Sequence, residues 1–319
     1  MVFEIPKEKW SGSIREVTIG ATKEEGGTRT SKVIIGGSSA LPYLNFEGSP
    51  GRKPALFMDV LDSLPADFPE AVKEEFGDAI NDPVSWAKKC VEFGAEGLCL
   101  KLVSTNPEGD GGSNEDAVNT LKAVLEAVGV PLIVYGSGHN ENDTKLMEMV
   151  SEAGKGERLL LGAAEEDWYK SIAVASMANG HCVIGFSNID INLAKQIVIL
   201  LKDFGIDLGN IVMDPLQAAL GVGLEYSYSI IERIRLAALM GDNLLQAPII
   251  CDLSLAWAAP DVNEVGDRLG EPTKRGIEWE ADTGMAALVA GAELLVVHSP
   301  SVLQRMKQAV DELYPGGGE

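Results

Sequence analysis

Basic residues are scarce in this chain of 319 residues, which has 26 lysines and arginines against 48 aspartates and glutamates. The formal charge of −22 repels phosphate backbones and anionic lipid headgroups, so we expect neither nucleic acid nor a membrane surface as a partner. The sequence also lacks an apolar run long enough to span a bilayer, and the first ten residues contain no continuous signal-peptide core. We therefore expect a cytoplasmic protein.

Cysteine and histidine are few. Cys90, Cys99, Cys182 and Cys251 lie far apart within apolar stretches and form no C-x-x-C pair, which predicts buried free thiols instead of metal or cluster ligands. Of the three histidines, only His298 ends a predicted strand. Neither an H-x-x-x-H metal motif nor a G-x-S-x-G nucleophile motif is present, so no hydrolase or metalloenzyme signature stands out.

What the sequence does contain is a regular alternation, from residue 54 onward, of short apolar runs with amphipathic helical patterns. The predicted strands are 55–60, 98–103, 132–136, 159–164, 182–186, 210–214, 249–254 and 294–299. Capping residues open the intervening helices and glycines close them, as βαβ units require. Eight such units predict a (β/α)8 TIM barrel over residues 54–319. An open Rossmann sheet is disfavoured because no complete G-x-G-x-x-G follows the first strand.

Residues 1–53 form a predicted N-terminal extension. Two β-rich runs, 17–20 and 32–36, flank the turn signal Gly26-Gly27 and predict a β-hairpin. We expect this hairpin to plug the N-terminal end of the barrel. The alternative is that its tip, residues 28–30, contacts a partner.

Ligands bind TIM barrels at the carboxyl ends of the strands, so the residues at those ends are the candidates for function. They are Asp59, Asp62, Lys101, Tyr135, Gly136, Ser187, Asn188, Asp214, Gln217, Asp252, Ser254, Trp257 and His298. Lys101 is either a Schiff-base lysine or, as we favour, the partner of an aspartate such as Asp59. The long segment 253–275 around Trp257 suits a lid, the face of a flat macrocycle or a subunit interface.

The segment 210–239 is the most informative stretch. Its strand ends at Asp214-Pro215, its turn carries Gly221 and Gly223, and a helical pattern follows. Glycines at such a turn let the backbone approach a ligand closely. A plain capping turn is the alternative.

Four stretches carry a family resemblance: TIGATKEEGGTRTSKVIIGG (18–37), INDPVSWAKKCVEFGAEGLCLKL (80–102), MDPLQAALGVGLEYSYSIIERIRLAAL (213–239) and RGIEWEADTGMAALVAGAELL (275–295). Together they resemble the small subunit of the corrinoid iron–sulfur protein, a family that includes the delta subunit of acetyl-CoA decarbonylase/synthase. The resemblance covers nearly the whole chain, and LGVGLEYSYSIIERIRLAAL is its most specific part.

The resemblance implies a barrel paired with a large subunit that carries the corrinoid-binding domain and a [4Fe–4S] cluster. A cobamide would lie between the subunits, at the barrel mouth. The heterodimer would accept a methyl group from methyltetrahydrofolate through a methyltransferase and deliver it to CO dehydrogenase/acetyl-CoA synthase in the reductive acetyl-CoA pathway. The chain itself would be a non-catalytic carrier subunit.

Position at the barrel mouth predicts the cobamide contacts. They are Asp214, Gln217, Leu220, Gly221, Gly223 and Tyr226, together with Ser187, Asn188 and Asp252.

Two enzymes are the alternatives. A pterin-dependent methyltransferase would hold methyltetrahydrofolate with Asp59, Asn188 and Asp214, although the strand ends at 135–136 and 163–164 offer few hydrogen bonds. A barrel aldolase would use Lys101.

Overall fold

The computed structural model describes residues 4–109, 111–264, 266 and 270–314. Eight parallel strands lie in the order β8-β7-β6-β5-β4-β3-β10-β9. A parallel bridge between Met213 and Ile249 joins the two outer strands and closes the sheet. The strands are β3 Ala55–Leu61, β4 Gly97–Lys101, β5 Leu132–Tyr135, β6 Leu160–Ala164, β7 Cys182–Phe186, β8 Ile211–Asp214, β9 Ile250–Asp252 and β10 Leu294–Val297. The predicted (β/α)8 barrel is confirmed.

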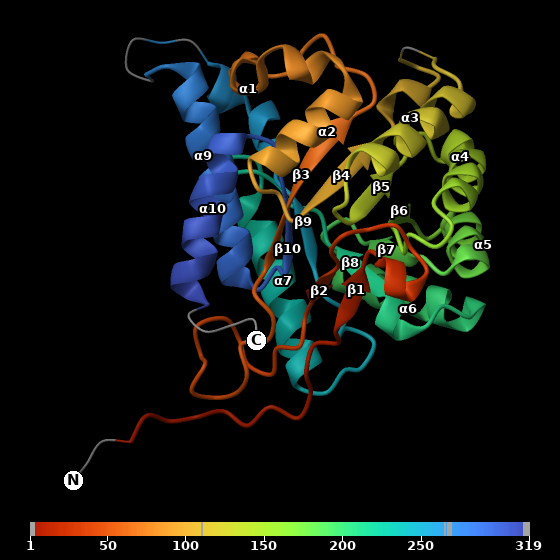
Figure 1. Cartoon of the computed structure of the whole chain (residues 1–319). Helices are drawn as coiled ribbons and strands as arrows, with labels where there is room; N and C mark the ends of the chain where they lie inside the picture. Colours follow the sequence, from red (N-terminus) through yellow and green to blue (C-terminus); the bar gives the residue numbers. More distant parts are fainter. Residues whose placement is uncertain (1–3, 110, 265, 267–269, 315–319) are drawn as a thin grey trace.

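Helices surround the barrel (Figure 1). They are α1 Glu70–Phe76, α2 Pro83–Glu92, α3 Asn114–Ala127, α4 Asn140–Ala153, α5 Tyr169–Asn179, α6 Ile191–Phe204, α7 Leu224–Leu239, α8 Pro260–Asn263, α9 Pro272–Ala290 and α10 Pro300–Leu313. Short 3-10 turns are η1 Lys23–Glu25, η2 Gly77–Asn81, η3 Val103–Thr105, η4 Leu208–Asn210 and η5 Ser254–Ala258. Among the helices of the described residues, none is both long and apolar enough to cross a bilayer.

The predicted caps explain where several helices begin. The Asp82 carboxylate accepts from the backbone N–H of Ser85 at 2.8 Å, and the Ser113 hydroxyl accepts from Asp116 N–H at 3.0 Å. The His139 side chain caps α4 by accepting a hydrogen bond from Asn142 N–H at 3.3 Å, and α5 begins after Trp168.

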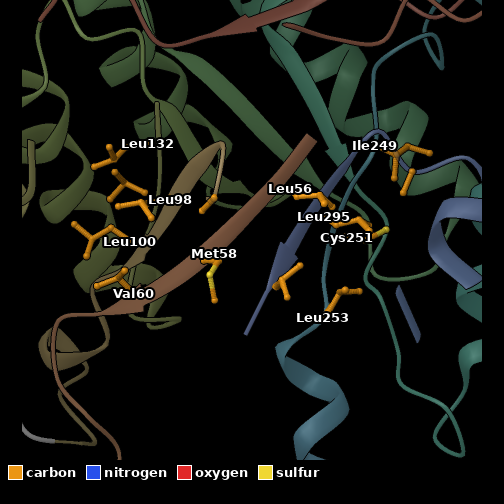
Figure 2. Packing of buried hydrophobic residues seen from close by; sticks show 14 of the residues in the cluster. Leu56, Met58, Val60, Leu98, Leu100, Leu132, Ile249, Cys251, Leu253 and Leu295 are labelled. Atoms are coloured by element: carbon orange, nitrogen blue, oxygen red, sulfur yellow. The ribbon is translucent and has the colours of Figure 1, made fainter. Parts of the chain in front are cut away.

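Strand side chains alternate between two apolar layers. Leu56, Met58 and Val60 of β3 point outward and pack beneath the helices (Figure 2). The residues between them point into the barrel, where Phe57 joins a separate apolar cluster. Parallel strands covered on both faces need apolar residues at both sets of positions, which is why the strand sequences read as continuous apolar runs.

The N-terminal hairpin closes one end of the barrel. Strands β1 Val17–Ile19 and β2 Val33–Ile35 pair antiparallel, and their buried side chains belong to the interior cluster. Figure 1 shows this hairpin where the barrel strands begin. Arg29 at the hairpin tip is only 3% exposed and pairs with Glu157 at 2.7 Å. The hairpin therefore plugs the barrel, and Arg29 is not available to a partner through this tip.

Candidate functional site

The inward positions change from apolar to ionisable where the strands end. They carry Asp59, Lys101, Tyr135, Asp214, Asp252 and His298 on β3, β4, β5, β8, β9 and directly after β10. Two-residue alternation forces this arrangement, because Phe57 and Cys99 lie two positions below Asp59 and Lys101 in the apolar interior. The polar layer therefore lies at the C-terminal mouth, directly above the apolar interior of the barrel.

Lys101 is the centre of one hydrogen-bonded cluster. Its Nζ lies 3.0 Å from Asp59 Oδ2, 2.7 Å from Asp252 Oδ2 and 3.0 Å from the Ser254 hydroxyl. Burial alone would lower the pKa of this ammonium, but the two aspartates raise the pKa above its usual value. A Schiff-base lysine must lose its proton, so this geometry opposes the aldolase hypothesis and confirms the predicted ion pair.

His298 extends the cluster. Its Nδ1 lies 2.8 Å from both oxygens of Asp59. Burial would raise the pKa of Asp59, but the charges of His298 and Lys101 lower it, so this carboxyl is ionised and Nδ1 carries the proton. No described residue hydrogen-bonds the second ring nitrogen, Nε2. Asp59 therefore orients a ring whose free edge is available to a ligand.

Tyr135 and Asp214 form a second pair across the mouth. The Tyr135 hydroxyl donates to Asp214 Oδ2 at 3.2 Å, and the Leu216 backbone N–H donates to Oδ1 at 2.9 Å. Burial raises the pKa of Asp214 to about 6, which leaves a fraction of this carboxyl protonated near neutrality. The pair can therefore both accept and donate hydrogen bonds.

Two cavities open beside these groups. The Asp214 cavity, of about 280 Å³, is lined by residues that include Tyr135, Asn140, Glu165, Trp168, Phe186 and Asp214. The His298 cavity, of about 630 Å³, is lined by residues that include Phe68, Lys101, Ser254, Trp257, Asn263 and His298. Lys101 lines both cavities, so its ion pairs form part of the wall between them.

The segment after β8 forms a raised turn on the mouth. Gly221 and Gly223 have φ of +81° and +107°, a left-handed backbone that suits glycine. The Ser227 hydroxyl donates to Leu216 C=O and accepts from Ala218 N–H, both at 2.8 Å, which fixes the base of the turn. Tyr226 is 63% exposed beside it. The turn thus presents backbone and an aromatic side chain to the outside.

Two buried polar atoms near this turn have no partner. Ser187 Oγ follows β7 and Gln217 Oε1 follows β8, and neither makes a hydrogen bond within the described residues. A backbone hydrogen bond of 2.8 Å from Ile189 N–H to Pro215 C=O joins the two loops. Buried groups without partners are costly in a folded protein, so each is a candidate for a ligand contact.

The structure brings most of the predicted residues into these groups and separates a few. Asp62 accepts from Ser104 apart from both cavities, and Asn188 is exposed outside them.

Trp257, for which the sequence leaves a lid, a macrocycle face and a subunit interface open, lines the His298 cavity. The segment 253–275 contains η5 and α8, and Trp257 is only 6% exposed. Its Nε1 donates to Glu280 at 2.7 Å. Sequence alone did not show that a carboxylate two turns into α9 would fix this indole.

Several cavity residues were not predicted. Asn140, Glu165, Trp168 and Asn263 lie one to eleven positions beyond the strand ends, in loops or in the helices that follow them. Position at a strand end does not predict these residues. A search for polar residues at helix starts would have found Asn140.

The described residues contain no group of three or more His, Cys, Asp or Glu side chains arranged to hold a metal ion. All four cysteines are buried and free, as predicted. Burial raises the pKa of the Cys99 and Cys251 thiols well above the usual range, so both are unreactive.

By its fold, the chain is a TIM barrel of the kind seen in dihydropteroate synthases. The Coxiella burnetii enzyme in complex with pteroic acid gives a TM-score of 0.57 at 15% identity, over 82% of this chain and 94% of that one. The Xanthomonas albilineans enzyme gives 0.56 at 16% identity, over 83% and 94%. At these identities the likeness concerns the fold alone.

Sequence similarity shows the family. The family model described as CO dehydrogenase/acetyl-CoA synthase delta subunit matches residues 16–307. The acetyl-CoA decarbonylase/synthase complex subunit delta of Archaeoglobus fulgidus is 38% identical over 98% of this chain and 71% of its own length. That of Methanopyrus kandleri is 37% identical over 96% and 76%. The chain belongs to the delta subunit family of the acetyl-CoA decarbonylase/synthase complex.

Proposed function

We propose that this delta subunit is the barrel half of a heterodimeric methyl carrier and that its mouth covers one face of a cobamide. The carrier takes a methyl group from methyltetrahydrofolate through a methyltransferase and passes it to acetyl-CoA synthase. The two unpartnered polar atoms beside the glycine turn, Ser187 Oγ and Gln217 Oε1, support this proposal best. Both atoms are closed to solvent in this structure, so they would meet the amide groups on the edge of a corrin ring once the two loops part to admit it.

The residues at the mouth fit a partner that covers them from outside. The Asp214 cavity of about 280 Å³ is too small to enclose a cobamide, so a companion chain has to cover the opposite face. The contacts we assign are Asp214, Gln217, Leu220, Gly221, Gly223 and Tyr226, with Ser187, Asn188 and Asp252 at the edge. When bound, the cobalt supplies the methyl-transfer chemistry. The chain's own residues bind the ring edge and keep water away.

The companion is, in this proposal, a large corrinoid subunit that also holds a [4Fe–4S] cluster. The cysteines of this chain, each fully buried and free, suit packing and not cluster ligation. Residues 1–53 form the plugging extension and residues 54–319 the barrel domain. This chain, its large-subunit companion, the methyltransferase and the acetyl-CoA synthase would all be cytoplasmic.

The glycine turn provides the test. Gly223→Val adds a side chain at φ +107°, and we expect it to reduce the visible corrinoid absorbance of the co-produced heterodimer at least several-fold. Gly180→Val is the matched control, because Gly180 has φ +75° and precedes β7 at the opposite end of the barrel. It should strain the backbone similarly without changing cobamide occupancy. Unchanged absorbance in a folded Gly223→Val heterodimer contradicts the proposal.

A pterin-dependent methyltransferase remains the second candidate because of the Asp214 cavity. Asn140 and Glu165 supply hydrogen bonds that the strand ends alone lack, and Tyr135 and Phe186 supply aromatic walls. Asp59, by contrast, is committed to Lys101 and His298, and Asn188 does not line the cavity. Tight binding of methyltetrahydrofolate to the isolated chain, weakened by Asp214→Asn, would favour this enzyme. Cobamide retention only with the large subunit would favour the carrier.

A further inference from the structure

We propose that the His298 cavity is a separate binding site for a small planar carboxylate. The cavity lies between β3, β4, the residues after β9 and the end of β10, on the other side of Lys101 from the Asp214 cavity. The proposed cobamide contacts do not account for His298, Ser254, Asn263 or Phe68. This inference is independent of the proposed carrier function.

Aromatic side chains form two walls of the cavity. The Phe68 ring centroid is 4.7 Å from that of His298, and the Trp257 centroid is 6.4 Å from it. The Glu280 carboxylate holds the Trp257 indole by a hydrogen bond of 2.7 Å. Because these rings are fixed by packing, a flat apolar ligand can stack in the space beside them with little ordering cost.

Two hydrogen-bond donors are available at the polar wall. Asp59 fixes His298 through Nδ1, which leaves Nε2 without a partner among the described residues. The Ser254 hydroxyl accepts from Lys101 Nζ at 3.0 Å, so its own proton is free to be donated. Two donors over an apolar floor match the two oxygens of a carboxylate.

The carboxylates in the same wall are already committed, which disfavours a cationic ligand. Asp59 pairs with Lys101 and His298, and Asp252 pairs with Lys101. Asp67 also lines the cavity but is exposed to solvent. The charges of the two aspartates, the lysine and a protonated histidine cancel, and burial raises the pKa of the neighbouring Glu280 to about 7, so this carboxyl is partly protonated near neutrality. An added anion is therefore attracted by the imidazolium edge and not repelled by a net negative wall.

Protonation of His298 sets the pH dependence of binding. The groups that face the ring are Asp59 on β3, Lys101 on β4, Glu280 on α9 and Asp67 in the loop before α1. Burial lowers the pKa of His298, but the negative charge of Asp59 raises it by a larger amount. The pKa of His298 therefore lies above its ordinary value. Carboxylate affinity should therefore be high at neutral pH and fall as the pH rises through this raised pKa.

Calorimetric titration of the full-length chain with benzoate tests the proposal. We expect saturable binding at one site, and no comparable binding of benzyl alcohol, which has the ring but lacks the carboxylate. His298→Gln should weaken benzoate binding at least ten-fold and Ser254→Ala several-fold. His139→Gln, on the far side of the mouth at the start of α4, should leave the affinity unchanged.

The outcomes are decisive in both directions. Absence of saturable benzoate binding, equal affinity for benzyl alcohol, or undiminished binding by His298→Gln each overturns the proposal. If His298→Gln fails to fold because Asp59 loses its partner, Ser254→Ala and the pH profile of the unmodified chain carry the test. An affinity that does not change between pH 6 and pH 9 then contradicts it.

Discussion

Lys101 forms part of the wall between the Asp214 cavity and the His298 cavity at the barrel mouth. It bridges Asp59, which is fully buried, and Asp252, and its side chain is itself only 15% exposed. Each ion loses hydration on burial, so the group is stable only while all three charges are present. From the sequence, Lys101 was a candidate Schiff-base nucleophile. In the structure it is the cation that pairs with Asp59 and Asp252.

Removing this ammonium should be costly. We expect Lys101→Met to lower the free energy of unfolding by about 3 kcal/mol, because the buried Asp59 and the partly buried Asp252 would lose the cation that they share. Lys145→Met, at an exposed position of α4, should change it by less than about 0.5 kcal/mol. Chemical denaturation of both variants measures the difference. Equal stability of the two would show that the Lys101 ion pairs are not stabilising.

His181 illustrates a buried histidine held neutral. Its Nδ1 accepts from the Leu159 N–H at 3.1 Å, and Nε2 donates to the Ser151 carbonyl at 2.9 Å. Burial lowers the pKa of His181 in the folded state. The unfolded chain therefore takes up the proton first as the pH falls, and folding loses stability below the ordinary histidine pKa of about 6.5.

The pH dependence of unfolding should reveal this contribution. Between pH 7.5 and pH 5.5, the free energy of unfolding of the unmodified chain should fall relative to that of His181→Gln. The comparison with the variant matters because burial also raises the pKa values of Asp214, Glu280 and Glu293, which act in the opposite direction. Parallel pH profiles for the two proteins would exclude a role for His181.

At the scale of elements, the N-terminal hairpin replaces the solvent that would otherwise fill the barrel bottom. Ile19 and Ile35 are fully buried against interior strand residues. Arg158, before β6, also donates to the Thr18 carbonyl at 2.8 Å. The hairpin therefore belongs to the barrel core, although it precedes the first barrel strand in the sequence.

Truncating a buried side chain of the N-terminal hairpin should destabilise the whole barrel. Ile35→Ala should cost about 2–5 kcal/mol of unfolding free energy through lost burial and a cavity. Ile34→Ala makes the same chemical change in the same strand at a half-buried position, so its cost should be clearly smaller. Thermal and chemical unfolding of both variants provide the measurement. A similar cost for the two would mean that the hairpin is loosely packed.

At the scale of the whole molecule, the acidic surface opposes compaction. A charge of −22 raises the energy of the folded state through self-repulsion. Screening lengths fall from about 10 Å at 0.1 M salt to about 3 Å at 1 M. The repulsion should therefore weaken strongly over ordinary salt concentrations.

Salt should stabilise this protein. We expect the melting temperature to rise by about 2 °C or more between 0.05 M and 0.5 M sodium chloride, which corresponds to roughly 1 kcal/mol for a chain of this size. Potassium chloride at equal ionic strength should give the same shift. A melting temperature that stays constant or falls would show that the surface charges are already balanced locally by pairs such as Arg305 with Glu278.

The sequence by itself determined the barrel, because alternation of apolar runs with capped helices repeats from residue 54 onward and needs no long-range information. It also determined that the strand ends would carry Asp59, Lys101, Asp214 and His298, since strand position fixes which end of a parallel sheet a residue occupies. Strand boundaries differed by only a few residues, as for β9, where Ser254 lies in η5.

Only the tertiary structure decided how those residues combine. Which aspartate pairs with Lys101, that His298 leaves one ring nitrogen free, and that Glu280 buries Trp257 all depend on contacts between residues far apart in the chain. The same holds for the two separate cavities. Such pairings depend on distance in space, strand tilt and loop path, which no local pattern in the sequence encodes.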